Sequence, residues 1–121
     1  MSRVDELNRI LRDLQSRTPD IEATALVSDD GLLLASALPR HIEELRVAGI
    51  SSTLLSLSSR AATELERGPV EQVVIGGAYG YSILVTAAHG TLLLVLTTAT
   101  AKLGLVFLNM ERAVEQIKKV L

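Results

Sequence analysis

One long uninterrupted segment limits the possible folds of this chain more than any other feature. Residues 40–67 contain no proline and a single glycine, Gly49, and therefore predict one continuous helix. At about 1.5 Å per residue, this helix would be roughly 40 Å long. A helix of that length needs a surface to pack on, and the segments on either side of it have the pattern of a β-sheet.

Five segments have the alternation or composition of β-strands, two before the long helix and three after it. Asp29-Asp30-Gly31 joins the first pair, and its glycine supplies the positive φ of a tight turn. Gly76-Gly77 and His89-Gly90 predict the later turns. The run 92–96 is apolar on both faces, which predicts a strand buried on both sides. The predicted strands are 22–27, 32–37, 70–75, 79–87 and 91–97.

Amphipathic helices are predicted at both ends of the chain, over about 2–16 and 100–121. The resulting order is α-β-β-α-β-β-β-α, within a single domain that spans residues 1–121. Only three residues are aromatic, so Leu, Val, Ile and Ala must form the core.

Charge and composition exclude several classes of partner. The formal net charge is -2, from 12 basic and 14 acidic residues, and no run of Lys or Arg could follow a phosphate backbone. We therefore expect no nucleic acid partner. The apolar runs are of strand length, far below the roughly 20 residues of a membrane span, so no membrane insertion is expected. The absence of cysteine and of an apolar segment near Met1 leads us to expect a cytoplasmic location.

The central helix has two contrasting arcs. One arc is apolar and is predicted to pack on the sheet; it comprises Val47, Ile50, Leu54, Leu57, Ala61 and Leu65. The opposite arc consists of small neutral residues with the single charge of Arg60, and the 13 residues from Val47 to Ser59 have no charge at all. An exposed helix face normally contains many Lys, Glu and Arg residues.

A neutral arc of this kind predicts contact with a second helix, because small side chains allow close approach and lose little rotamer entropy. The alternative is that these Ser and Thr residues simply occupy an exposed surface. We expect a two-fold homodimer, in which the strand 70–75 lies at the sheet edge and pairs with its own copy. The predicted interface comprises Gly49, Ser52, Thr53, Ser56, Ser59, Arg60, Thr63, Val70, Gln72 and Val74.

Several segments in this layout resemble the Roadblock family, whose founding members include dynein light chains, and most of all its stand-alone bacterial and archaeal forms. The first matching segment is Asp30-Gly31-Leu32-Leu33-Leu34-Ala35-Ser36-Ala37-Leu38-Pro39, on the first hairpin. The central helix, rich in Ala, Ser and Leu, matches as well. The others are Glu71-Gln72-Val73, Gly80-Tyr81 and Ala101-Lys102-Leu103-Gly104-Leu105-Val106. Their order and spacing cover nearly the whole chain.

The resemblance implies a Roadblock/longin (profilin-like) α+β sandwich. In this fold the central helix covers one face of a five-stranded antiparallel sheet, and the two terminal helices cover the other. The resemblance also implies a homodimer joined through the central helices and third strands, and a role as a scaffold or regulator that binds a small Ras-like GTPase without hydrolysing nucleotide itself.

No pattern of catalytic, cofactor-binding or metal-binding residues is found, and we expect the protein not to be an enzyme. His41 and His89 each lack a second ligand at helical spacing, and Asp29 and Asp30 fit a turn better than a calcium loop. The glycine-rich stretch 76–80 lacks the lysine of a phosphate-binding loop and precedes a strand.

Two alternatives remain from the sequence. The first is a ligand-sensing domain of profilin-like architecture, in which Tyr79 and Tyr81 beside Ser82 line a pocket; the other role for these tyrosines is packing in the core. Both are expected on the same face of their strand. The second is a purely structural unit that assembles with itself and binds no ligand.

Overall fold

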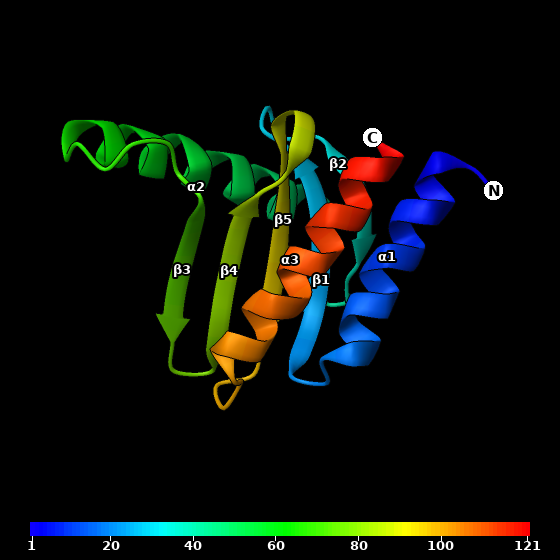
Figure 1. Cartoon of the computed structure of the whole chain (residues 1–121). Helices are drawn as coiled ribbons and strands as arrows, with labels where there is room; N and C mark the ends of the chain where they lie inside the picture. The colour runs from blue at the N-terminus through cyan, green and yellow to red at the C-terminus, as the bar shows by residue number, and fades with distance from the viewer.

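The computed structural model describes all residues, 1–121, and has the predicted order of three helices and five strands (Figure 1). The five strands form one antiparallel sheet in the order β2-β1-β5-β4-β3. The elements are α1 (Arg3–Arg17), β1 (Ile21–Ser28), β2 (Leu33–Ala37), α2 (Glu44–Glu64), β3 (Gln72–Gly77), β4 (Gly80–Thr86), the short 3-10 helix η1 (Ala88–Gly90), β5 (Thr91–Thr97) and α3 (Leu103–Val120).

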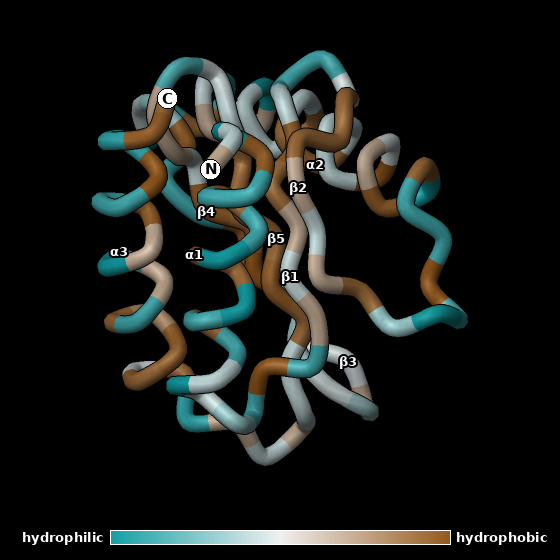
Figure 2. Tube along the Cα trace, turned by 90° about the vertical axis from the view of Figure 1, so that its right-hand side faces the viewer, coloured by the Kyte–Doolittle hydropathy of each residue, from teal (hydrophilic) through white to brown (hydrophobic).

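The helices cover the two faces of the sheet as predicted, with α1 and α3 on one face and α2 on the other (Figure 1). Strand β5 lies at the centre of the sheet, and six of its seven residues are buried, which confirms the prediction from its apolar run. Hydrophobic residues are concentrated along the strands between the helices (Figure 2). The fold is therefore the expected α+β sandwich.

The two layers of the core differ in size. The layer under α1 and α3 has 14 buried residues, among them Leu11, Leu26 and Met110. The layer under α2 has only seven, among them Val47 and Leu94. Both are aliphatic, as the composition predicts. Because buried apolar area supplies most of the stability of a packed helix, α2 is held by its own protomer less firmly than the terminal helices are.

Element boundaries differ from the predictions mainly around the central helix. The residues before it form a turn, in which the Ile42 amide donates to the Pro39 carbonyl, and α2 begins only at Glu44. Its end is set by two positive φ values, 57° at Glu66 and 86° at Gly68, which reverse the chain. With 21 residues, α2 is roughly 31 Å long.

The prediction for the β3–β4 turn was wrong. Gly76 and Gly77 are paired within the β3–β4 ladder, and the chain turns at Ala78 and Tyr79 instead. Gly80 makes this possible, because its φ is 156° and a Cβ there would overlap the carbonyl oxygen of Thr97. Tyr79 is consequently 95% exposed at the turn and does not share a strand face with Tyr81.

Candidate dimer interface

Helix α2 has little contact with its own protomer. Only Val47, Ala48 and Ser51 are buried among its 21 residues, and none from Ser52 to Glu64 is. The helix packs mainly on β1 and β2, and its C-terminal end extends beyond β3 (Figure 1). An isolated helix of about 12–15 residues is only marginally stable in water. The C-terminal half of α2 therefore has the properties of a helix that needs a further surface to pack on.

The buried face of α2 differs from the predicted one by about a quarter turn, at 100° per residue. Ile50, Leu57 and Leu65, predicted to pack on the sheet, are 52%, 64% and 66% exposed. Val47 and Leu54 of the predicted arc do pack on the core under α2, together with Ala48 and Leu55, which lie outside that arc. Ser51 is buried on the same side. The Ser51 hydroxyl donates to the Val47 carbonyl at 2.8 Å, so its burial leaves no polar group without a partner.

All ten residues of the predicted interface lie at least partly at the surface. Gly49, Thr53, Ser56, Arg60, Thr63, Gln72 and Val74 are exposed, whereas Ser52, Ser59 and Val70 are half-buried. Ser52 is turned toward the β1–β2 hairpin, since a Cβ on Gly31 would lie 3.3 Å from its hydroxyl oxygen. A hollow lined by Ser59, Thr63 and Val70 connects the helix to the start of β3.

Apolar residues outside the predicted interface also belong to this surface. Ile50 and Leu57 directly follow Gly49 and Ser56 on the helix, and Ile75 on β3 is 42% exposed. The signal was present in the sequence as the apolar arc of the central helix, but that arc was assigned to the core. The exposed surface is therefore more hydrophobic than a strip of hydroxyl and glycine residues alone.

Strand β3 is an open sheet edge, as predicted. The Thr86 amide donates to the Glu71 carbonyl at 3.2 Å, so these two residues form a hydrogen-bonded pair. Hydrogen-bonded and non-hydrogen-bonded pairs alternate along an antiparallel ladder. By that alternation Val73 and Ile75 direct their backbone groups toward β4, while Gln72, Val74 and Gly76 direct theirs away from the sheet. Five of the six β3 residues are exposed. The edge thus presents a row of unpaired amides and carbonyls.

The opposite edge, β2, is protected in a way that β3 is not. Val27 pairs with Leu33 and Leu26 pairs with Ala35, so Leu34 is an extra residue in β2. A bulge of this kind disturbs an edge for further pairing. The β3–β4 register has no shift, and β3 contains neither proline nor a charged residue. Of the two edges, only β3 is regular enough to add another strand.

A sequence model of the Roadblock/LC7 domain matches residues 7–97 of this chain, which includes all five strands and the central helix. The chain belongs to the Roadblock/LC7 family. Its Roadblock/LC7 relatives include the uncharacterized protein MJ1340 of Methanocaldococcus jannaschii. The two are 37% identical over 112 residues, which cover 93% of this chain and 96% of MJ1340.

Solved structures agree with this assignment. A Roadblock/LC7 domain from Streptomyces avermitilis has a TM-score of 0.87 and 26% identity, over 93% of this chain and 94% of that one. MglB of Myxococcus xanthus has a TM-score of 0.88 and covers 97% of this chain and 88% of its own. At 19% identity, the likeness to MglB is one of fold alone.

Other candidate sites in this Roadblock/LC7 domain are the histidines, the acidic residues and the glycine-rich turn. No group of three or more His, Asp or Glu residues is placed to hold a metal ion, and His41 and His89 are exposed. No helix has the length and hydropathy to cross a membrane. The glycines at 76, 77 and 80 belong to the β3–β4 hairpin and precede no helix, so they form no phosphate-binding loop.

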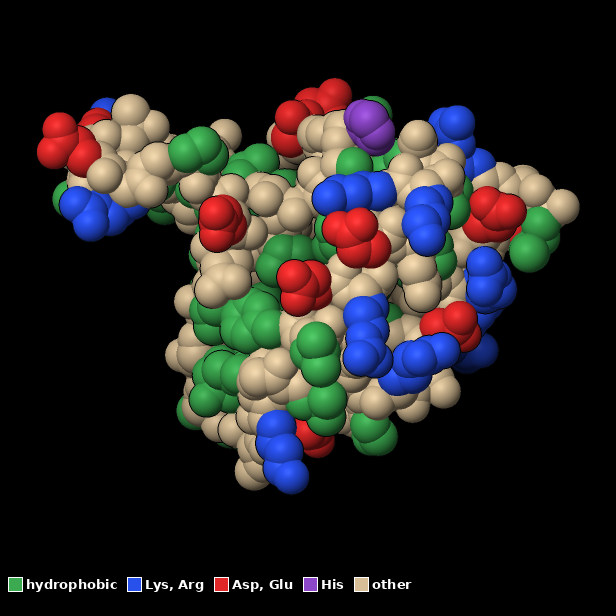
Figure 3. All heavy atoms as spheres, in the orientation of Figure 1, with side chains coloured by type: hydrophobic (Ala, Val, Ile, Leu, Met, Phe, Trp, Pro, Cys, Tyr) green, Lys and Arg blue, Asp and Glu red, His purple; other side chains and the backbone are tan.

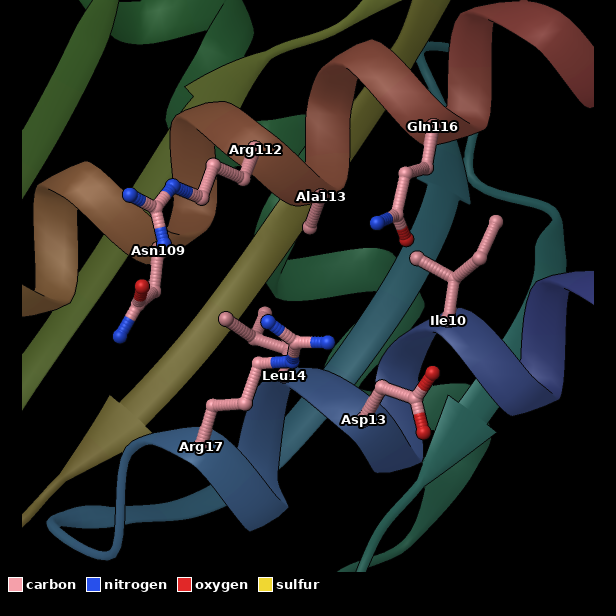
Figure 4. A pocket seen from close by; sticks show the side chains of 8 residues that line it. All are labelled: Ile10, Asp13, Leu14, Arg17, Asn109, Arg112, Ala113 and Gln116. Atoms are coloured by element: carbon pink, nitrogen blue, oxygen red, sulfur yellow. The ribbon is translucent and has the colours of Figure 1, made fainter.

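The pocket suggested for a ligand-sensing role is not found. None of the five surface hollows is lined by Tyr79, Tyr81 or Ser82, and Tyr81 packs instead on the core under α3. A small hollow between α1 and α3 is lined by Arg17 and Arg112, among others (Figure 4). Its volume of about 30 Å³ corresponds to a single water molecule.

Proposed function

We propose that this protein is a non-catalytic, cytoplasmic homodimer that binds a small Ras-like GTPase and modulates its nucleotide cycle or its location. The observation that carries the dimer is the uncovered C-terminal half of α2 next to the open edge of β3. Membership of the Roadblock/LC7 family supports the GTPase as partner, since the family resemblance implies scaffolds and regulators of such proteins.

Two copies of β3 would pair in antiparallel fashion across a two-fold axis. Only Gln72, Val74 and Gly76 have free backbone groups, so these three must form the new ladder. All three are used when Val74 lies on the axis, because Gln72 then faces Gly76 of the partner subunit. This register gives about six backbone hydrogen bonds and joins the two sheets into one.

The α2 helices would pack against each other on one face of the joined sheet. Gly49 and Ser56 have small side chains or none, which allows the backbones of the two helices to approach closely. The Thr53 hydroxyl already donates to the Gly49 carbonyl at 2.8 Å, so covering it with a second helix leaves no unsatisfied donor. Ile50 and Leu57 would leave water in the same step, and their apolar area supplies the driving force.

The GTPase would contact a surface that both protomers form. The chain has no phosphate-binding loop, so nucleotide would be bound by the partner and the dimer would act on its conformation. A two-fold dimer offers the partner two copies of every residue that stays exposed outside the dimer interface. Charged residues at such positions affect the rate and specificity of association more than its strength.

The experiment has two parts. Sedimentation equilibrium of the purified protein is expected to give a dimer at micromolar concentration, and a stable monomer would overturn the dimer. The small GTPases of the same organism are then tested individually for co-elution, nucleotide exchange and GTP hydrolysis, with and without the protein. We expect at least one GTPase to co-elute or to change its rate. If none responds in any of the three assays, the proposed role as a GTPase regulator is wrong.

A further inference from the structure

A groove runs between α3 and the two outer strands on the face opposite α2. It has a volume of about 450 Å³. A band of hydrophobic side chains lies over β3 and β4 beside α3, in the left half of Figure 3. The residues that line the groove are Gln72, Val85, Thr86, Phe107, Met110, Glu111 and Val114.

The groove exists because α3 covers only part of the sheet. Phe107 and Val114 lie on the flank of α3 that faces β4, and they pack against the core without being fully buried. Val85 on β4 forms the floor. The apolar floor continues to the sheet edge at Val74, which is paired with Ile83 and is 41% exposed. The surface is thus elongated along α3 and β4 and is not a closed pocket.

One negative charge lies in this apolar groove. Glu111 is the only charged residue of the lining, and it takes part in none of the three salt bridges of the protein. The next residue of α3, Arg112, lines the hollow on the α1 side of the helix, and Lys118 contacts Glu115 at 3.1 Å. An unpaired carboxylate beside apolar side chains favours an occupant with an apolar face and a positive charge next to it.

We propose that this groove binds an amphipathic helix of a partner protein, with Lys or Arg residues flanking its apolar face. The lining residues of α3 span residues 107–114, a wall of roughly 12 Å, which is the length of about two helical turns. Helices bind to such grooves through apolar residues at i, i+3, i+4 and i+7. The wall residues Phe107, Glu111 and Val114 lie outside the segment that matches the family model, residues 7–97.

The proposal is independent of the dimer. Backbone pairing of β3 lies in the plane of the sheet, whereas the side chains of Gln72 and Val74 point out of it toward the α3 side. The groove is therefore complete in one protomer and stays open in the proposed dimer. A second copy of this chain is a poorer occupant, because α2 and the β3 edge, the surfaces proposed for the dimer, lie on the other face and the rim of the sheet.

The test uses two designed peptides of 18 residues with the same leucine face, one flanked by lysine and the other by glutamate. Binding is measured by fluorescence anisotropy and mapped by NMR on the isotope-labelled protein. We expect the lysine peptide to bind at least tenfold more tightly, with chemical shift changes around Val85, Phe107 and Val114. If neither peptide saturates below millimolar concentration, or if the changes map to α2, the proposal is wrong.

Variants separate groove binding from general charge attraction. Glu111→Lys should weaken the lysine peptide at least tenfold and strengthen the glutamate peptide. Glu22→Lys makes the same charge change at an exposed position on β1 and should leave both affinities within twofold. Equal effects of the two variants would overturn the proposal. The Ser56→Glu variant, which is expected to be monomeric, should still bind the lysine peptide. If this monomer does not bind the peptide, the groove is not contained in one protomer.

Discussion

The side-chain amide of Asn109 donates a 2.6 Å hydrogen bond to the hydroxyl of Thr18, which joins α3 to the C-terminal end of α1. Both residues are buried, at 7% and 1% exposure. Replacing Asn109 with Leu leaves the Thr18 hydroxyl unpaired, and we expect a loss of about 1–3 kcal/mol in the free energy of unfolding.

Urea denaturation followed by circular dichroism measures this loss. The double variant Asn109→Leu with Thr18→Val removes both polar groups, and it should be more stable than the sum of the two single variants predicts. Additive single effects would show that this hydrogen bond does not connect the two helices energetically.

Gly80 is expected to tolerate no side chain. An alanine there would have a φ of 156° and a Cβ overlapping the Thr97 carbonyl, so β4 and the end of β5 would have to separate. We expect Gly80→Ala to destabilise the protein by about 3 kcal/mol or more. Gly104→Ala is the matched control, because nothing lies within 4 Å of a Cβ at that helical position. Thermal unfolding of the two variants should differ clearly, and similar melting temperatures would contradict this account of the turn.

Proline substitutions in β3 distinguish its two sides. Val74 directs its amide away from the sheet, so Val74→Pro should leave the protomer folded but weaken the dimer by removing a donor from the proposed ladder. Ile75 directs its amide toward β4, so Ile75→Pro should destabilise the protomer itself by about 3 kcal/mol. Sedimentation and thermal unfolding report the two effects separately. A Val74→Pro variant that dimerises as tightly as the parent would rule out pairing through β3.

A negative charge on α2 should split the dimer. Ser56 is exposed, so Ser56→Glu leaves the protomer intact while placing two carboxylates near the two-fold axis, and Ser59→Glu should act in the same direction. We expect the dimer Kd to rise at least tenfold. Ser16→Glu adds the same charge to an exposed position on α1 and should leave the Kd unchanged. Sedimentation equilibrium of the three variants decides whether α2 forms the contact.

The orientation of α2 can be tested with aspartate. Val47 is 7% exposed beneath the helix, so Val47→Asp should unfold the protein, because a charge would be buried without a partner. Leu57 is 64% exposed, so Leu57→Asp should preserve the protomer and weaken only the dimer. Circular dichroism and sedimentation distinguish these outcomes. Unfolding of the Leu57 variant would mean that the apolar arc packs on the sheet after all.

Local patterns in the sequence were enough to predict the order of elements, the burial of β5 on both faces and the open edge of β3. Period-two alternation, apolar runs and glycine-containing turns act over a few residues, so they can be read without knowledge of the rest of the fold. The same is true of the exposure of the small, mostly uncharged residues on α2, although whether they meet a second subunit is still a prediction.

The tertiary structure decided the rotation of α2 and the position of the β3–β4 turn. The helix has apolar residues on one arc and small residues on the others, and a helical wheel treats the larger apolar arc as the core. In the folded protein the small residues Ala48 and Ser51 face the sheet, because they let the helix lie close to it, and Ile50 and Leu57 are left outside. The turn depends in the same way on the carbonyl of Thr97, which is distant in sequence from Gly80. Which face of an element meets its neighbour is set by the space between the elements, and no local pattern contains that information.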